Sequence, residues 1–584
     1  MPDQIHPFDL QARAALAARS LTALIDAQRD GLMYFLGTWR SHPPRAHHCL
    51  WDYGDGSGRH IDALTLMHAM SSAESNDAPT QQGEAQLEAW MLRMLGDDGL
   101  SWLPPEDLGK PWGIEQLLVD WQPGTPAAEI SWAQRGTLMG LVSRYQATTD
   151  ERYLTYACRM IDGLLAIAIR HPRGLYLPEG YYRPAGWSYD QPGFHAGIEE
   201  YNAAIVPPAI RLYEIAGYQP ALELATGLVD FAVYYTPCYL PNGRFRPSED
   251  MLESHFHTRS NFILGVLKLG LVAQRREYVS WARQSYDQAR DWGTDFGWFP
   301  EGLPLRHGET CCTTDMLEIA LLLGAHVDRR YYADAERYGR NHLLETQFLS
   351  RERLEEAVER LPPIDAGPLN PIDSTDQGVL ETQVGAFAAR STLNDAFHLD
   401  ATSMMQCCNA AGARALYDLW RYAVEDVQAE GTDEPHYAIH LRFSVVTPGL
   451  TVRSHEPAQG RLDIIARDAC TLEVRLPQGT TQAMVVHMNA QGEQRVEVAM
   501  PQEGYIATRI NAGQAIEVHY PLVERVASYE VGAGDHTLTC TGVWRGETLM
   551  QIEPRGHYYA LYERSADLEP VDAAPPAGPL IDSI

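Results

Sequence analysis

The sequence predicts a mainly α-helical protein with a C-terminal all-β domain, in the form of an (α/α)6 barrel followed by an antiparallel β-sandwich. Two observations carry this prediction. Apolar residues recur with helical periodicity along residues 10–425, whereas short alternating segments separated by Gly, Pro and Asn follow from residue 437 onward. Long loops rich in Trp, His, Gly and Pro join the helical segments, and such loops favour a closed barrel with a cleft over an open solenoid.

The length of the chain, 584 residues, is too great for one ordinary core, so more than one domain is expected. The pattern changes from helical to β-rich near residues 427–435. We therefore predict a barrel domain over residues 1–430 and a β-sandwich over 431–568. The Pro- and Ala-rich residues 569–584 are expected to form a loosely ordered tail.

The barrel prediction rests on about six helical pairs. Three segments come first, at residues 11–36, 60–72 and 84–95. Four units then repeat, in which one helix ends at a turn and a second begins: 133–146 with 153–162, 204–216 with 221–230, 262–273 with 278–287, and 315–325 with 331–338. A last helix over 404–424 completes the set.

Composition restricts the class of partner. The net charge is −31, which argues against nucleic acid or an anionic membrane, because both require clustered Lys and Arg. An uncharged substrate such as a small carbohydrate is compatible with that charge. No run of about 18 apolar residues occurs, so no membrane span is expected.

The cysteine content and the N-terminus bear on location. The first residues have no basic start and no apolar run, so they do not resemble a signal peptide. Nine cysteines, an odd number without such a signal, indicate reduced thiols in a cytoplasmic protein. The sequence leaves the oligomeric state open between monomer and homodimer.

Two short segments concentrate the chemistry. His307-Gly-Glu-Thr-Cys-Cys312 and Gln406-Cys-Cys-Asn409 hold four of the nine cysteines, and each opens a predicted helix. The positive end of a helix lowers the pKa of a thiol there. If the two openings meet, one carboxylate and up to three thiolates would suit a tetrahedral zinc ion. The alternative is that these cysteines are small apolar fillers, and the residues alone leave both interpretations open.

The same segments resemble glycoside hydrolase family 127, the β-L-arabinofuranosidase-like proteins. The resemblance lies in Glu309-Thr-Cys311, in Cys407-Cys408-Asn409 leading into residues 412–416, and in residues 385–395. It implies an (α/α)6 barrel with β-sandwich material and a zinc ion bound by Glu309, Cys311, Cys407 and Cys408. It also implies that Cys407 is the nucleophile, because the first cysteine of the second pair has that role in the family.

A thiolate nucleophile replaces one of the two carboxylates of an ordinary retaining glycosidase, so a proton donor is still needed. Glu301 is the candidate acid/base, because it lies in an aromatic loop where burial would raise its pKa. The family's acid/base lies further upstream of the metal glutamate, at a spacing that Gly293 occupies here, which makes Asp295 a rival. Cys312 is extra to the motif, and we leave it out of the site.

Four residues are candidates for sugar binding. His195 and His257 open predicted helices and resemble sugar-contacting histidines of the family, with His255 as an alternative to His257. His48 lies in the first long loop, and Trp298 is an aromatic loop residue of the kind that sugar clefts use. Bracing of helices and loops is the competing interpretation for each of them.

Taken together, these observations predict a zinc-dependent retaining glycosidase with Cys407 as nucleophile, acting on a β-L-arabinofuranoside or a related small glycoside. One alternative is a carbohydrate-active lyase or isomerase on the same barrel, with His and Tyr or Glu as acid and base. Another is a sugar-binding module in which the metal is purely structural.

Overall fold

The computed structural model describes eleven segments of the chain: residues 6–70, 78–103, 126–192, 202–236, 238–246, 255–302, 307–399, 404–427, 434–488, 494–531 and 537–565. The predicted domain limits at residues 430 and 568 and the predicted tail over 569–584 lie outside these segments and stay predictions. Within the described residues, no helix combines the length and the apolar character needed to cross a membrane.

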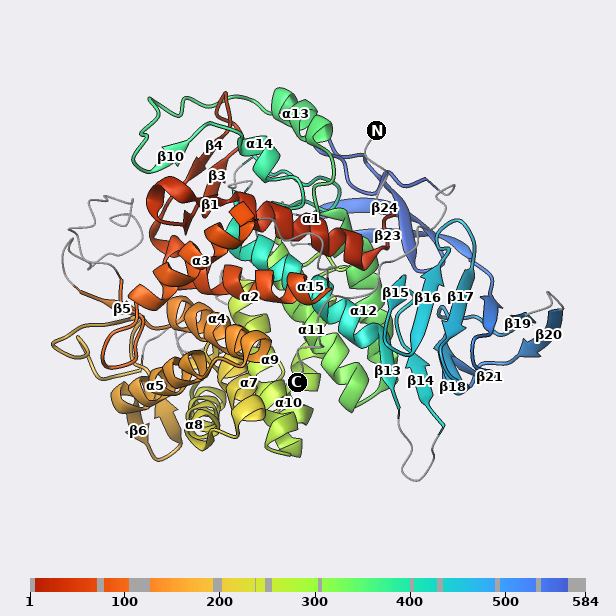
Figure 1. The fold of residues 1–584 in the computed structure, drawn as a ribbon, viewed down its shortest axis with the longest axis horizontal. Coiled ribbons are helices and arrows are strands. Elements are labelled where there is room, and N and C mark those ends of the chain that lie inside the picture. The colour runs from red at the N-terminus through yellow and green to blue at the C-terminus, as the bar shows by residue number, and fades with distance from the viewer. Residues whose placement is uncertain are drawn as a thin grey trace.

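Six helices of the described chain form a closed inner ring. They are α2 (Asp55–Met70), α4 (Trp132–Thr148), α7 (Val206–Ala216), α9 (Phe256–Val272), α11 (Thr310–His326) and α15 (Gln406–Ala423). Each packs against the next, and α15 packs back against α2 (Figure 1). Nearly every residue of α2, α9 and α11 is buried, as expected for helices enclosed on all sides.

A second set of helices covers the ring. They are α1 (Leu10–Ala23), α3 (Ala78–Arg93), α5 (Glu151–Ile167), α8 (Gln219–Tyr235), α10 (Arg276–Ala289) and α12 (Tyr332–Tyr338). The buried residues of α5 include Tyr153, Ala157 and Ile161, which lie on one face at helical spacing, so this helix has one apolar and one solvated side. Outer and inner helices alternate along the chain, and the predicted (α/α)6 barrel is confirmed.

The prediction of one helix over residues 11–36 was wrong in its second half. Helix α1 ends at Ala23, and three short strands follow: β1 (Ile25–Asp26), β2 (Leu32–Met33) and β3 (Leu36–Thr38). Asp30 and Gly31 have φ angles of 56° and 88°, a left-handed backbone that a continuous helix excludes. Amphipathic periodicity continues through this turn, which is why the sequence pattern does not reveal it.

Further short elements lie in the loops at the barrel. The strands are β4 (Arg45–His47), β5 (Ala128–Glu129), β6 (Ile169–His171), β7 (Gly174–Tyr176), β8 (Tyr181–Tyr182), β9 (Gly308–Glu309), β10 (Ser374–Thr375), β11 (Arg390–Ser391) and β12 (Met404–Met405), and the helices are α13 (Arg351–Arg360) and α14 (Val379–Thr382). Two of the pairings matter for function. Strand β9, paired with β11, directly precedes the inner helix α11, and strand β12, paired with β3, directly precedes the inner helix α15.

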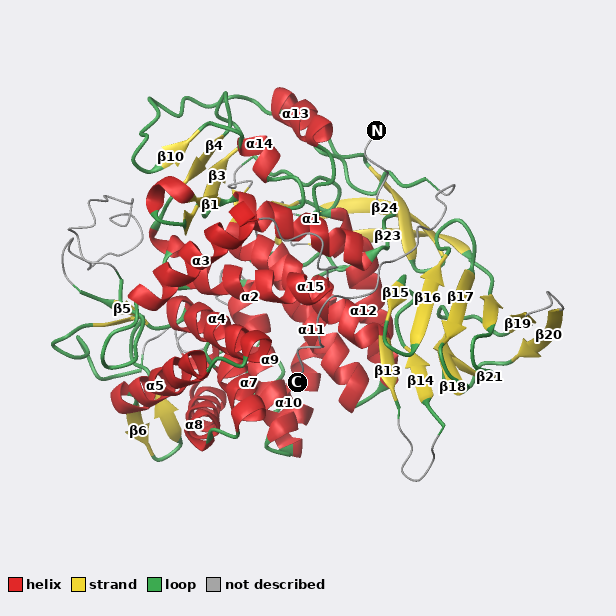
Figure 2. Ribbon diagram, viewed as in Figure 1, coloured by secondary structure: helices red, strands yellow, loops and turns green. Residues whose placement is uncertain are grey.

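The C-terminal part is all β (Figure 2). A four-stranded sheet has the order β13-β14-β18-β21, a six-stranded sheet the order β15-β16-β17-β22-β19-β20, and a three-stranded sheet the order β23-β24-β25. Their strands are β13 (Val424–Asp426), β14 (His436–Ile439), β15 (Val445–Val446), β16 (Leu450–Ser454), β17 (Arg461–Ala466), β18 (Cys470–Arg475), β19 (Ala483–Met488), β20 (Gln494–Ala499), β21 (Tyr505–Ile510), β22 (Ala515–His519), β23 (Glu524–Val531), β24 (Leu538–Arg545) and β25 (Thr548–Glu553).

The first two of these sheets share one core. Leu472 and Val474 of β18 and Leu462 and Ile464 of β17 belong to the same cluster of buried side chains. Residues alternate between buried and solvated along β16 and β17, as they do in the sheets of a sandwich. Among the described strands of these sheets, the pairings are antiparallel except β14 with β18, which is parallel.

A buried ionic network joins the barrel to the β domain. Its members are Glu336, Arg340, Arg442, Glu456, Arg475 and Glu547, and none is more than 5% exposed. Arg442 is bonded to Glu456 at 2.9 Å and to Glu547, and Arg475 is bonded to Glu336. Burial alone would raise the pKa of Glu336, but the surrounding arginines outweigh burial and lower it. The Glu336 carboxylate is therefore ionised and depends on its arginine partners.

Candidate metal and active site

Short strand pairings set the position of the two cysteine segments. Glu309 of β9 lies opposite Arg390 of β11, and α11 begins at the next residue. In the other segment, Met405 lies opposite Leu36, and the Gln406 backbone N–H donates to the Phe35 carbonyl at 3.0 Å. Both segments therefore leave a strand and enter an inner helix at the same end of the barrel.

The two helix starts bring four candidate ligands together. One ligand atom from each of Glu309, Cys311, Cys407 and Cys408 lies within 4.8 Å of the others, and all four residues are buried. The Cys408 Sγ lies 3.5 Å from the Cys311 Sγ, 4.0 Å from the Cys407 Sγ and 3.4 Å from Glu309 Oε1.

This arrangement fits zinc. A tetrahedral ion with Zn–S bonds of about 2.3 Å has ligand atoms about 3.8 Å apart, which is close to the spacings of 3.4–4.0 Å around the Cys408 Sγ. Three sulfurs and one carboxylate oxygen are also ligands that zinc accepts. The donor set therefore matches zinc in number, type and spacing.

The thiols of this cluster differ in acidity. Bonds from Cys311 and Cys408, assisted by the charge of Arg59, outweigh burial and lower the pKa of Cys407 to about 5. Burial and the neighbouring thiols raise the pKa of Cys408 well above its usual range. The Cys407 thiol is therefore ionised at neutral pH, and a thiolate is the reactive form of cysteine. This arrangement suits Cys407 as a nucleophile.

Cys312 lies beside the cluster but outside the group of four. Its Sγ lies 3.9 Å from Glu309 Oε2, and its side chain is fully buried. Burial and the charge of Glu309 raise the pKa of the Cys312 thiol well above its usual range. Cys312 is therefore a neutral thiol next to the candidate ligand Glu309.

Glu301 lies next to the cluster, but its expected acidity needs correction. Arg390 Nη2 lies 2.6 Å from one Glu301 carboxylate oxygen, and His307 Nε2 lies 2.5 Å from the other. Burial alone would raise the pKa of Glu301, but these two partners and His255 outweigh burial and lower it to about 2. The sequence prediction of a raised pKa was wrong, because Arg390 and His255 from other parts of the chain, together with the nearby His307, approach the Glu301 carboxylate.

The two other positions considered for an acid/base do not face the cluster. Asp295 accepts bonds from the Tyr529 hydroxyl at 2.7 Å and from Arg525 at 3.2 Å, both on β23. A Cβ atom at Gly293 would lie 2.4 Å from the Phe299 ring, so a carboxylate side chain has no room there. The structure therefore favours Glu301 over Asp295 as the acid/base candidate.

Both histidines at the start of α9 lie near the cluster. His255 Nε2 lies 2.6 Å from Glu309 Oε2, the carboxylate oxygen that does not face Cys408, and 3.9 Å from Glu301. His257 Nδ1 lies 2.6 Å from Asp315, and its ring stacks on Trp132 with centroids 5.0 Å apart. His255, the alternative at sequence level, is thus the histidine that contacts a candidate ligand.

The remaining predicted sugar contacts lie elsewhere. His48 is 5% exposed, and its ring nitrogens lie 2.7 Å from Asp52 and 3.2 Å from Asp26. Trp298 is 1% exposed, and its indole N–H donates to the Ser391 carbonyl at 3.1 Å. These two residues support loops and do not present an open face to a sugar. His195 lies outside the described residues.

Two residues near the cluster were missed at sequence level. Arg390 lies in the segment 385–395 that carries part of the family resemblance, so its place in that motif is a signal that points to it. Arg59, in the second turn of α2, contacts Cys311 and Cys407. Nothing in the sequence around Arg59 distinguishes it from an ordinary helical arginine.

Comparison with known proteins gives a consistent result for the fold. No protein-family model matches the sequence, and no curated protein does. Among solved structures, a family 127 β-arabinofuranosidase is 13% identical with a TM-score of 0.59, over 93% of this chain and 82% of that one. A family 127 β-L-arabinofuranosidase from Geobacillus stearothermophilus T6 is 13% identical with a TM-score of 0.54, over 94% of this chain and 81% of that one. The chain therefore has the fold of glycoside hydrolase family 127 enzymes, the family that its cysteine motifs resemble.

Proposed function

We propose that this protein is a zinc-dependent retaining glycosidase in which Cys407 is the nucleophile. The observation that carries the proposal is the convergence of Glu309, Cys311, Cys407 and Cys408 at one end of a barrel with the family 127 fold. Zinc bound by these four residues would keep the thiols ionised at neutral pH. A small carbohydrate is the proposed substrate, and a β-L-arabinofuranoside is the first choice because of the fold.

The residues divide the reaction between them. The Cys407 sulfur attacks the anomeric carbon, a C–S bond forms and the glycosidic C–O bond breaks, so the sugar is transferred to the enzyme. The leaving oxygen needs a proton at the same time. Because Glu301 is ionised, we propose that this proton is held by the Glu301–His307 pair and reaches the leaving oxygen through the Glu301 carboxyl group.

The second half of the reaction reverses the roles. A water molecule attacks the anomeric carbon, the C–S bond breaks, and the Glu301–His307 pair takes up the proton that the water loses. Two displacements at one carbon restore its original configuration. His255 would hold the Glu309 carboxylate in place throughout, because the His255 Nε2 lies 2.6 Å from Glu309 Oε2. The chemistry requires reduced thiols, which is compatible with the cytoplasmic location expected from the sequence.

The proposal predicts turnover of 4-nitrophenyl β-L-arabinofuranoside by the zinc-loaded protein, with the β anomer of arabinose as the first product. Nitrophenol absorbance and proton NMR of the fresh product measure these two outcomes. Release of the α anomer would contradict the retaining mechanism. An unsaturated sugar that absorbs in the ultraviolet would indicate a lyase, and saturable binding without turnover of any glycoside would indicate a binding module.

A further inference from the structure

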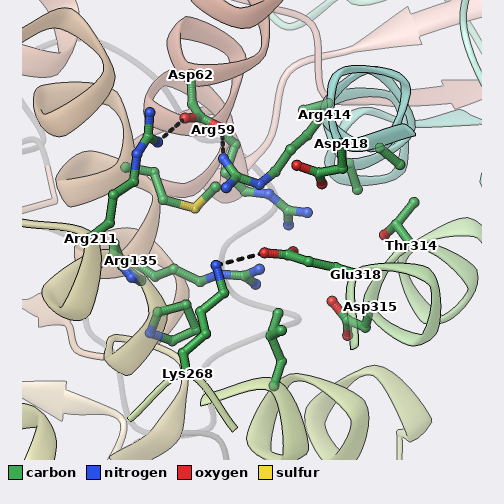
Figure 3. A pocket seen from close by; sticks show the side chains of 17 residues that line it. Arg59, Asp62, Arg135, Arg211, Lys268, Thr314, Asp315, Glu318, Arg414 and Asp418 are labelled. Atoms are coloured by element: carbon green, nitrogen blue, oxygen red, sulfur yellow. Dashed lines mark hydrogen bonds and ion pairs between the residues drawn. The ribbon is translucent and has the colours of Figure 1, made fainter. Parts of the chain in front are cut away.

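A charged cavity lies on the barrel axis, beyond the cluster. It is a small cavity, of about 40 Å³, and is lined by residues of all six inner helices (Figure 3). On five of the six helices the lining residues follow the helix start by about one to three turns, so the cavity lies deeper in the barrel than the four candidate ligands. Its basic residues are Arg59, Arg135, Arg211, Lys268 and Arg414.

The arginines of this cavity have different partners. Arg211 and Arg414 both bind Asp62, at 2.9 Å and 2.8 Å. Arg59 lies 3.6 Å from its carboxylate neighbour Asp55, which is a looser pair. The ion pair with Asp55 therefore leaves donor groups of the Arg59 guanidinium available for other acceptors.

Arg59 directs these donors at the cysteine segments. Its Nη2 donates to the Cys407 carbonyl oxygen at 3.0 Å and lies 3.6 Å from the Cys311 Sγ. One guanidinium therefore links three inner helices, because Arg59 belongs to α2, Cys311 to α11 and Cys407 to α15. Both contacts come from Nη2, and the planar guanidinium fixes the direction of its N–H groups more firmly than a flexible ammonium group does.

The net charge of the zinc-loaded site gives a reason for an arginine at this position. Three thiolates and one carboxylate carry four negative charges, zinc carries two positive charges, and the loaded centre therefore has an excess of two negative charges. An uncompensated charge in a buried site is costly. Arg59 is 5% exposed and contacts the cluster directly, so it supplies positive charge where that excess arises.

We infer that Arg59 is a positioning residue for the metal centre, which fixes Cys311 and the start of α15 in the binding geometry and compensates the charge of the loaded site. This inference rests on the proposed zinc site. Partners that orient metal ligands in this way typically contribute 10- to 100-fold to metal affinity. Arg59 should therefore set how tightly the metal is held, beyond any effect on catalysis.

The test compares Arg59→Met with Arg211→Met in the full-length chain. Arg211 is a matched control, because it is 3% exposed and lines the same cavity but binds Asp62 instead of the cluster. Competition with a chromogenic chelator measures zinc affinity. We expect Arg59→Met to bind zinc about 10- to 100-fold more weakly than the parent protein, Arg59→Lys to lie in between, and Arg211→Met to be unchanged.

A spectroscopic measurement separates positioning from a general loss of packing. In the cobalt-substituted protein, loss of an N–H···S bond raises the energy of the sulfur electrons, so the sulfur-to-cobalt band should move to longer wavelength in Arg59→Met and not in Arg211→Met. Should Arg59→Met fail to fold, Arg59→Lys carries the same comparison. If both Arg59 variants have the zinc affinity and the band position of the parent protein, the inference about Arg59 is overturned, but the proposed function is not. A parent protein that binds no zinc would overturn the proposed function as well.

Discussion

Replacement of Cys407 by alanine is expected to lower kcat/KM for an aryl β-L-arabinofuranoside by about four orders of magnitude or more. Loss of a covalent nucleophile has effects of this size, because the remaining groups still bind and orient the substrate but no covalent intermediate forms. With its pKa lowered to about 5, the Cys407 thiol is ionised at neutral pH. Steady-state kinetics on the zinc-loaded variant measure the effect.

Cys312→Ala is the matched control for this experiment. Cys312 is also a buried thiol at the start of α11, and its Sγ lies 3.9 Å from Glu309, yet it is not one of the four candidate ligands. Its removal should leave kcat/KM near that of the parent protein. Full turnover in Cys407→Ala would show that Cys407 is not the nucleophile. A severe loss of kcat/KM in Cys312→Ala would indicate that the active thiol lies on α11 and not on α15.

Replacement of Arg442 by methionine is expected to cost about 3–5 kcal/mol of unfolding free energy. Arg442 is fully buried and binds Glu456 at 2.9 Å and Glu547. Methionine fills much of the same space but leaves carboxylates buried without their shared cation, and an uncompensated buried charge is the dominant cost. Urea unfolding followed by circular dichroism measures the loss.

Arg351→Met is the control for that substitution. Arg351 pairs with Glu355 at 2.8 Å and with Glu381 at 2.5 Å, but all three side chains are about half exposed, so these pairs are screened by water. No measurable change in the urea midpoint is expected there. A midpoint in Arg442→Met equal to that of the parent would show that the network between barrel and β domain contributes little to stability.

Much of the architecture could be predicted from sequence because its periodicity is strong. The predicted helix over residues 133–146 corresponds to α4, and the β-rich pattern that begins near residue 437 corresponds to strands such as β17. The break after α1 was missed, because it depends on the left-handed backbone of Asp30 and Gly31 within an otherwise helical pattern. Local pattern thus identifies the elements but does not reveal a turn that keeps the same periodicity.

The candidate site was also predictable from the sequence only in part. Glu309, Cys311, Cys407 and Cys408 were identifiable because two motifs at helix starts carry them, and the structure brings the four together. The acidity of Glu301 was not predictable, because Arg390 comes from a strand almost ninety residues further along the chain. Trp298 shows the same limit, since an aromatic residue in a loop has the same sequence signature whether it faces a sugar or the core.

The most direct test of the central claim is X-ray absorption at the zinc edge of the purified full-length protein. The expected spectrum has three sulfur neighbours at about 2.3 Å and one oxygen at about 2.0–2.2 Å, as a site of one glutamate and three cysteines requires. Replacement of Cys408 by serine should lower the sulfur count to two. A protein without bound zinc, or zinc surrounded only by nitrogen and oxygen, would contradict the assignment.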